Sequence, residues 1–204
     1  MLKRLFDIVV SLTLLVMLTP LFLLLAVCIK LDSKGAILFR QERMGRKGVP
    51  FMIFKFRTMY VESQAKGALT VGEDKRITRV GKVIRDCRID ELIQLLNVLL
   101  GDMSLVGPRP EVAKYTNYHK KKWQRVLSVR PGITGLASIL YSKQEADILA
   151  KAKDVDAAYV KKVLPKKLGY EVFYTKHSSL KLDLLIIWWT VKFILFPKKR
   201  LGLR

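Results

Sequence analysis

The sequence predicts a mostly helical α+β fold, with an N-terminal membrane helix, a small β-hairpin and a helical domain that carries amphipathic helices. Residues 8–29 form an almost unbroken apolar run, and residues 36–56 hold two apolar stretches around a turn rich in Gly and Lys. Farther along, Leu residues recur at helical spacing between Gly and Pro breaks. Since no long linker divides the remainder, we expect an anchor over residues 1–34 and one domain over residues 35–204.

The charge balance favours an anionic partner. Lys and Arg number 38 against 17 Asp and Glu, a formal net charge of +21. Nucleic acid, anionic lipid headgroups and phosphorylated substrates all fit this charge, and a membrane segment favours the last two. The two cysteines, Cys28 and Cys87, lack the paired spacing of a zinc site or a disulfide framework. We therefore expect the chain to face a reducing cytoplasm.

The apolar run is long enough to cross a membrane but does not have to do so. As a straight helix its 22 residues would extend about 33 Å. Lys3 and Arg4 precede it and further basic residues follow it, which draws both ends to the cytoplasmic face. Thr19 and Pro20 interrupt its middle, where proline removes a helix hydrogen bond. These residues alone leave a re-entrant helix broken at Thr19-Pro20 and a bent transmembrane helix both open.

The C-terminal region contains a second candidate membrane contact. Residues 180–196 are apolar but include Lys181, Asp183 and Lys192, with the pair Trp188-Trp189 inside and a basic stretch at 198–200. This pattern is typical of a helix lying in the interface, where the basic stretch meets anionic lipids. A buried amphipathic helix packing on the domain is the alternative.

Between these segments we expect the following elements. The β-hairpin spans residues 36–56, a polar loop spans 61–75 and a short helix spans 77–85. A helix begins at Asp90, places Leu92, Leu95, Leu96 and Leu99 on one face and ends at Gly101. Rigid loops cover 107–110 and 130–135. Two more helices cover 111–128 and 143–164, and Pro165 ends the second.

Adjacent carboxylates, Asp90 and Glu91, are the candidate chemical groups. At a helix start they would be stabilised by free N–H groups and by the helix dipole. The cations Arg85, Arg88 and Arg109 lie close in sequence and suit phosphate oxygens. A carboxylate can attack phosphorus to form an acyl phosphate, and Mg2+ binds through one or two carboxylates plus substrate oxygens. We expect Asp90, flanked by arginines, to have a depressed pKa.

Several ordered motifs resemble the bacterial sugar transferase family, the small monotopic phosphoglycosyl transferases. They are Phe54-Lys-Phe-Arg-Thr-Met59, Ile89-Asp-Glu-Leu92, Leu96-Asn-Val-Leu99, Gly101-Asp-Met-Ser-Leu-Val-Gly-Pro-Arg-Pro110 and Arg130-Pro-Gly-Ile-Thr-Gly135. The likeness extends from the N-terminal anchor to the segment ending at Asp183, which is nearly the whole chain.

The resemblance implies that a sugar 1-phosphate passes from a UDP-sugar to polyprenyl (undecaprenyl) phosphate, with release of UMP. Asp90 would be the nucleophile of a covalent phosphosugar intermediate and the Mg2+ ligand, and Glu91 would act in acid/base chemistry or positioning. Lys55, Arg85 and Arg109 match positions that cradle phosphates. The family's anchor is a re-entrant helix broken at a pair such as Thr19-Pro20, which favours that topology, on the cytoplasmic face of the bacterial inner membrane.

The match to the family weakens in two places. Residues 136–143 depart from the usual continuation of the Pro-Gly-Ile-Thr-Gly loop, so the resemblance does not identify the sugar. Glu171 stands where the family often has Asp, while Asp183 keeps the family residue. We treat Arg88, Glu171 and Asp183 as supporting residues around the site, with a structural role equally open for Glu171 and Asp183.

Two other functions compete with this interpretation. The total charge and the run Lys120-Lys-Lys-Trp123 fit a membrane-tethered nucleic-acid binder, but no recognition motif accompanies them, so no nucleic acid is expected. A non-catalytic membrane scaffold for polysaccharide assembly is the second alternative. The sequence leaves a homodimer open.

Overall fold

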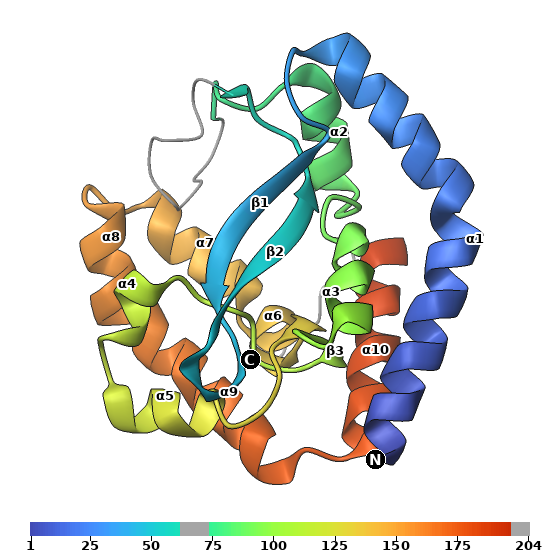
Figure 1. The fold of residues 1–204 in the computed structure, drawn as a ribbon. Helices are drawn as coiled ribbons and strands as arrows, with labels where there is room; N and C mark the ends of the chain where they lie inside the picture. Colours follow the sequence, from blue (N-terminus) through green and yellow to red (C-terminus); the bar gives the residue numbers. More distant parts are fainter. Residues whose placement is uncertain (62–73, 197–204) are drawn as a thin grey trace.

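The computed structural model describes residues 1–61 and 74–196. Its largest element is α1, Leu2–Asp32, which curves around one side of the molecule (Figure 1). Among the described residues α1 is the one helix long and apolar enough to cross a membrane by length and composition. The helix continues through Pro20, which has no N–H to donate, and the Thr19 hydroxyl donates to the carbonyl of Leu15 at 2.8 Å. In place of the break expected at Thr19-Pro20, the structure has one continuous curved helix.

Polar contacts attach both ends of α1 to the same domain. At the N-terminal end, Lys3 pairs with Asp183, and Arg4 donates to the carbonyl of Val98 at 2.7 Å. At the other end, the buried Arg57 donates to the carbonyl of Ser33 at 2.7 Å, as well as to that of Lys34. Arg57 thus binds the carbonyl groups that the last turn of a helix leaves free.

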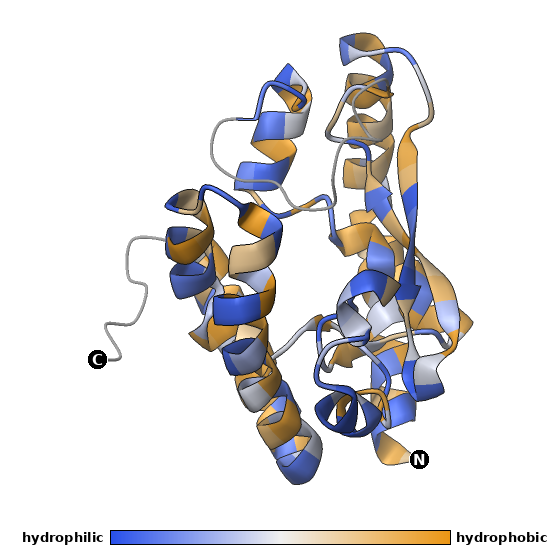
Figure 2. Ribbon diagram, turned by 90° about the vertical axis from the view of Figure 1, so that its left-hand side faces the viewer, coloured by the Kyte–Doolittle hydropathy of each residue, from blue (hydrophilic) through white to orange (hydrophobic). Residues whose placement is uncertain are grey.

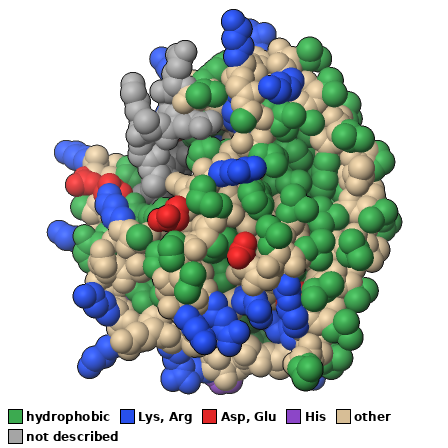
Figure 3. All heavy atoms as spheres, viewed as in Figure 1, with side chains coloured by type: hydrophobic (Ala, Val, Ile, Leu, Met, Phe, Trp, Pro, Cys, Tyr) green, Lys and Arg blue, Asp and Glu red, His purple; other side chains and the backbone are tan. Residues whose placement is uncertain are grey.

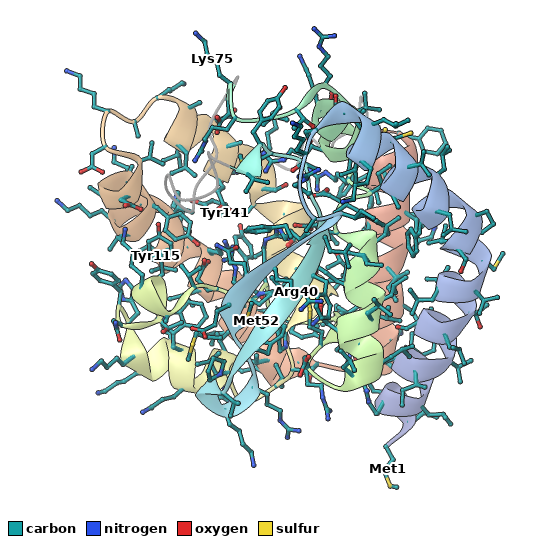
Figure 4. All side chains as sticks on the ribbon, turned by 45° about the horizontal axis from the view of Figure 1, so that its top comes forward. Met1, Arg40, Met52, Lys75, Tyr115 and Tyr141 are labelled. Carbon is teal, nitrogen blue, oxygen red and sulfur yellow. The ribbon has the colours of Figure 1, made fainter. Side chains whose placement is uncertain are left out.

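The expected β-hairpin is confirmed. Strands β1, Leu38–Met44, and β2, Pro50–Phe56, pair antiparallel with Phe39 opposite Lys55 and Arg40 opposite Phe54. Side chains alternate between its two faces. Arg40 and Met52, labelled in Figure 4, lie on the exposed face, where the Arg40 guanidinium sits 5.4 Å from the Phe54 ring centre. The opposite face carries Lys55.

Short elements follow the hairpin. Helix α2 spans Arg79–Asp86, a 3-10 turn spans Leu92–Gln94, and α3 spans Leu95–Leu100 and ends at Gly101 with φ +97°. Asp90 and Glu91 precede the 3-10 turn, so the expectation that they form a first helical turn is wrong. The strands β3, Ser104–Val106, and β4, Gly132–Thr134, form a parallel pair where we expected only rigid loops.

The C-terminal half is helical. Its elements are α4, Ala113–Thr116; α5, Lys120–Val126; α6, Leu136–Leu140; α7, Ser142–Ala150; α8, Val155–Ala158; a π-helical turn, Tyr159–Val163; α9, Leu164–His177; and α10, Leu180–Leu195. The expected helix over 111–128 is broken at His119, whose φ is +56°. Pro165 lies in the first turn of α9, not at the end of a helix, because proline needs no N–H there.

Apolar side chains cover the outer side of the anchor. Most helices of the domain mix hydrophilic and hydrophobic residues (Figure 2), whereas hydrophobic side chains gather along the edge that α1 occupies (Figure 3). Helix α10 also exposes one apolar stripe, whose members are Leu184, Leu185, Trp188, Val191 and Ile194. The basic stretch at 198–200 and most of the loop expected over 61–75 lie outside the described residues.

Candidate functional site

A cavity of about 510 Å³ opens between the hairpin, the turn before α3, the helices α6, α7 and α9, and the π-helical turn. Asp90 and Glu91 line it together with every cation expected from the sequence, namely Lys55, Arg85, Arg88 and Arg109. Tyr115, labelled in Figure 4, lines it from α4. Two carboxylates and four cations thus line one cavity, although they come from segments as far apart in sequence as Lys55 and Arg109.

Glu91 is held by two cations. The guanidinium of Arg109 donates to Oε1 at 2.6 Å and to Oε2 at 3.1 Å. The ammonium of Lys55 donates to Oε1 at 2.7 Å. Burial raises the pKa of Glu91, but these two cations outweigh it and hold the pKa well below its usual value. Glu91 is therefore a fixed anion with both oxygens occupied.

The contacts and the pKa of Asp90 differ from those of Glu91. Asp90 takes part in none of the ion pairs between described residues. Burial raises its pKa and the charge of Glu91 adds to that, while Lys55 and Arg85 lower it less. The expected depression of the Asp90 pKa is thus wrong: the arginines are close, but desolvation and the neighbouring carboxylate outweigh them.

Backbone contacts on both sides fix the position of Lys55. The N–H of Phe56 donates to the Asp90 carbonyl at 3.0 Å, and the N–H of Phe54 donates to Asn97 Oδ1 at 3.0 Å. Asn97 Nδ2 also donates to the carbonyl of Met52 at 2.8 Å. The fully buried Asn97 thus pairs with β2 as a further strand would. Asn97 belongs to the motif Leu96-Asn-Val-Leu99, but the sequence alone does not predict this role.

The two upstream arginines reach the cavity differently. Arg85 Nε donates to Thr58 Oγ1 at 2.8 Å, which directs its guanidinium from α2 along the cavity wall. Arg88 lies in the turn after α2 with φ +56°, a left-handed conformation uncommon for a residue other than glycine.

The loop that carries Arg109 is held by a hydrogen bond to Glu171 and by close packing at Gly107. Its backbone N–H donates to Glu171 Oε1 at 3.2 Å. A Cβ on Gly107 would lie 2.5 Å from the carbonyl oxygen of Arg130, so only glycine lets this loop pack against the β4 strand. Glu171 is buried, its Oε2 has no hydrogen-bond partner among the described residues, and burial raises its pKa to about 7.

Asp183 does not reach the cavity. It lies at the start of α10, accepts from Tyr174 Oη at 2.7 Å and pairs with Lys3. It therefore ties the N-terminus of α1 to α10, and of the two late carboxylates only Glu171 contacts a cavity residue.

A second group of polar and charged residues also lines the cavity. Glu111 accepts from Tyr159, from Lys167 at 3.5 Å and from Arg43 at 3.3 Å. The sequence does not predict this cluster, because Arg43 and Tyr159 belong to distant segments with no motif of their own. Only the position of Glu111 after the Gly107–Pro110 loop was a signal.

The donor set fits a magnesium ion that is shared with a phosphorylated substrate. No group of three or more His, Cys, Asp or Glu side chains that could hold a metal occurs among the described residues. Mg2+ usually binds through one or two carboxylates and completes its shell with phosphate oxygens and water. Since cations occupy both oxygens of Glu91, Asp90 is the carboxylate available for that role.

The chain belongs to the bacterial sugar transferase family, whose sequence profile matches residues 1–197. It is 39% identical over 193 residues to a UDP-glucose:undecaprenyl-phosphate glucose-1-phosphate transferase of Klebsiella pneumoniae, covering 93% of this chain and 39% of that protein. It is 40% identical to a UDP-N-acetylgalactosamine-undecaprenyl-phosphate N-acetylgalactosaminephosphotransferase of Aeromonas hydrophila, covering 95% of this chain and 43% of that protein.

The chain spans about two fifths of the length of these two relatives. A relative of similar size is the exopolysaccharide production protein PSS of Rhizobium leguminosarum bv. phaseoli, which is 37% identical over 93% of both chains.

Proposed function

We propose that this protein transfers a sugar 1-phosphate from a UDP-sugar to polyprenyl (undecaprenyl) phosphate and releases UMP, as an initiating step of bacterial glycoconjugate or exopolysaccharide synthesis. One observation carries the proposal. Asp90 and Glu91 line the same cation-lined cavity, where Glu91 pairs with Lys55 and Arg109 while Asp90 forms no ion pair with a described residue. The names of the Klebsiella and Aeromonas relatives support the reaction class, since both name a sugar-phosphate transfer to undecaprenyl phosphate.

In the first step, a carboxylate oxygen of Asp90 attacks the β-phosphorus of the donor. The bond from that phosphorus to the bridging oxygen breaks, and UMP leaves with the bridging oxygen. In the second step, an oxygen of polyprenyl phosphate attacks the same phosphorus and breaks the bond to Asp90. The products are free Asp90 and a polyprenyl diphosphate sugar. Asp90 forms no ion pair with a described residue. This supports its role as nucleophile, because the attacking oxygen needs an available lone pair.

Glu91 acts by positioning rather than by acid/base chemistry in this proposal. A carboxylate held by Lys55 and Arg109 with a low pKa is a poor proton carrier at neutral pH. It instead fixes the two cations in place, so that their remaining N–H groups face the phosphates. Arg85 and Arg88 supply further positive charge along the wall.

Magnesium, bound through Asp90 and the substrate phosphates, would neutralise charge on the diphosphate. The protein's own part is to present one carboxylate beside fixed cations.

The anchor is proposed to enter and leave the membrane by its cytoplasmic face. Support comes from the contacts at its two ends: Arg4 and Arg57 bind opposite ends of α1 to the same domain. A helix that crossed the bilayer would separate these ends by about 30 Å of hydrocarbon. The exposed apolar stripe of α10 supports an interfacial position for that helix.

The test of this function is UMP release from a panel of UDP-sugars with polyprenyl phosphate and Mg2+. We expect turnover with at least one donor and its loss in Asp90→Asn and in Glu91→Gln. A wild-type protein inactive with every donor in a lipid environment, or an active Asp90→Asn variant, would overturn the proposal.

A further inference from the structure

Three arginines from distant segments lie near one another, two of them at the C-terminal end of α3 and the third at the segment that leads into Arg130. Arg130 Nε donates to the carbonyl of Gly101 at 2.8 Å. A Cβ built on Gly101 would lie 3.8 Å from a terminal nitrogen of Arg4. Arg46, in the hairpin turn, donates from Nε to the carbonyl of Ser128 at 3.1 Å. We call Arg4, Arg46 and Arg130 the arginine cluster.

The cluster lacks compensating acids. None of its members belongs to an ion pair between described residues. Burial lowers the pKa of Arg130, the charges of Arg4 and Arg46 lower it further, and Asp7 is the one acid that raises it. Backbone carbonyls accept from both terminal nitrogens of Arg4, but only from the Nε of Arg46 and of Arg130. In the described part of the chain, the terminal nitrogens of Arg46 and Arg130 make no hydrogen bond.

Exposed leucines border the cluster. Leu100, next to Gly101, is 69% exposed, and Leu5, next to Arg4, is 60% exposed. Figure 3 shows Lys and Arg side chains gathered on the lower face of the molecule, beside the hydrophobic edge along α1. An apolar surface next to arginines that form no ion pair with described residues suits the headgroup level of a bilayer. At that depth the acyl chains end and the phosphates begin.

We propose that the arginine cluster is a binding site for the phosphate of an anionic phospholipid headgroup. Guanidinium groups bind phosphate oxygens in pairs, and the terminal nitrogens of Arg46 and Arg130 are available for this. The adjacent leucines contact the acyl chains. The site fixes the depth and rotation of the N-terminal end of α1 in the membrane. It rests on α1 lying in lipid and is separate from the catalytic cavity.

The experiment is native mass spectrometry of the full-length protein in neutral detergent, titrated with short-chain phosphatidylglycerol, short-chain phosphatidylcholine or inorganic phosphate. We expect saturable binding of one phosphatidylglycerol, with much weaker binding of phosphatidylcholine. Each arginine at a membrane surface contributes about 1 kcal/mol. Arg46→Gln/Arg130→Gln should therefore bind phosphatidylglycerol about 30-fold more weakly.

The matched control is Lys151→Gln/Lys153→Gln, which removes the same charge at exposed positions near the end of α7. It should bind like wild type; an equal loss in the control would mean that only net charge matters and would overturn the site. Inorganic phosphate binding as tightly as phosphatidylglycerol would overturn the lipid assignment.

A second measurement needs no variant. A photoactivatable phosphatidylglycerol should label wild-type peptides around residues 46, 100 and 130, and labelling confined to other regions would contradict the proposal. Because both readouts measure binding, their failure would leave the transferase reaction untouched, and an inactive enzyme would leave this site untouched.

Discussion

The guanidinium of Arg109 holds the carboxylate of Glu91 at both oxygens, with nitrogen–oxygen distances of 2.6 and 3.1 Å. Lys55 shares Oε1 at 2.7 Å. As a result the two neighbouring carboxylates differ sharply: the pKa of Glu91 is lowered and that of Asp90 is raised. One carboxylate binds two cations, while the other forms no ion pair with a described residue.

Replacing Arg109 by Lys should reduce kcat for UMP release by about 10- to 100-fold, because a lysine keeps the charge but loses the two-pronged contact. Arg125→Lys, an exposed change on α5, is the control and should be neutral. Wild-type turnover in Arg109→Lys would show that the paired contact has no catalytic importance.

The pH profile should report the charge around Asp90. Arg85 lowers the Asp90 pKa, so Arg85→Gln should raise that pKa. The acidic limb of kcat/KM, where Asp90 becomes protonated and unreactive, should then move to higher pH. Lys82→Gln removes the same charge from the exposed face of the same helix and should leave the limb in place. A shift to lower pH in Arg85→Gln would contradict the electrostatic account.

Asn97 should be important both for stability and for the placement of Lys55. Asn97→Leu leaves the N–H of Phe54 and the carbonyl of Met52 without partners. We expect a loss of about 2–4 kcal/mol in the free energy of unfolding, together with lower activity at temperatures where the variant remains folded. Denaturation of Asn97→Leu is compared with that of Asn117→Leu, an exposed control directly after α4. Equal stability of the two variants would contradict this role.

Glu171 should make the protein less stable as pH rises. Its unfolded pKa is near 4.5 and its folded pKa is about 7, so the folded state binds more protons between these values. The stability from this group is complete below about pH 4.5 and is lost as pH rises to about 7, a change of about 3 kcal/mol. In Glu171→Gln this part of the pH dependence of the melting temperature should vanish. An unchanged pH profile would show that Glu171 does not titrate in this range.

The elements that the sequence predicts well are those with a strong local signal. The apolar anchor, the hairpin and the stop at Gly101 follow from hydrophobic runs and turn residues, and the structure has them at nearly the expected bounds. The β3–β4 pair escaped prediction because each strand has three residues and its partner is distant in sequence. The break at His119 has no Gly or Pro to mark it.

The candidate site also has a part that local motifs predict and a part that depends on the folded structure. Its motifs identified the residues around Asp90, and the structure brings those residues to one cavity. The direction of the Asp90 pKa shift could not be predicted from the residues adjacent in sequence. It depends on burial, which raises the pKa by more than the nearby arginine lowers it. The Glu111 cluster joins residues 43, 111, 159 and 167, a combination visible only after folding.

The most direct test of the account is the mass of the intact protein after incubation with a UDP-sugar and Mg2+ in the absence of polyprenyl phosphate. We expect an increase equal to one sugar phosphate, located at Asp90 by peptide mapping and lost when polyprenyl phosphate is added. Asp90→Asn should show no adduct. An adduct on another residue, or transfer to polyprenyl phosphate by Asp90→Asn, would contradict the central claim.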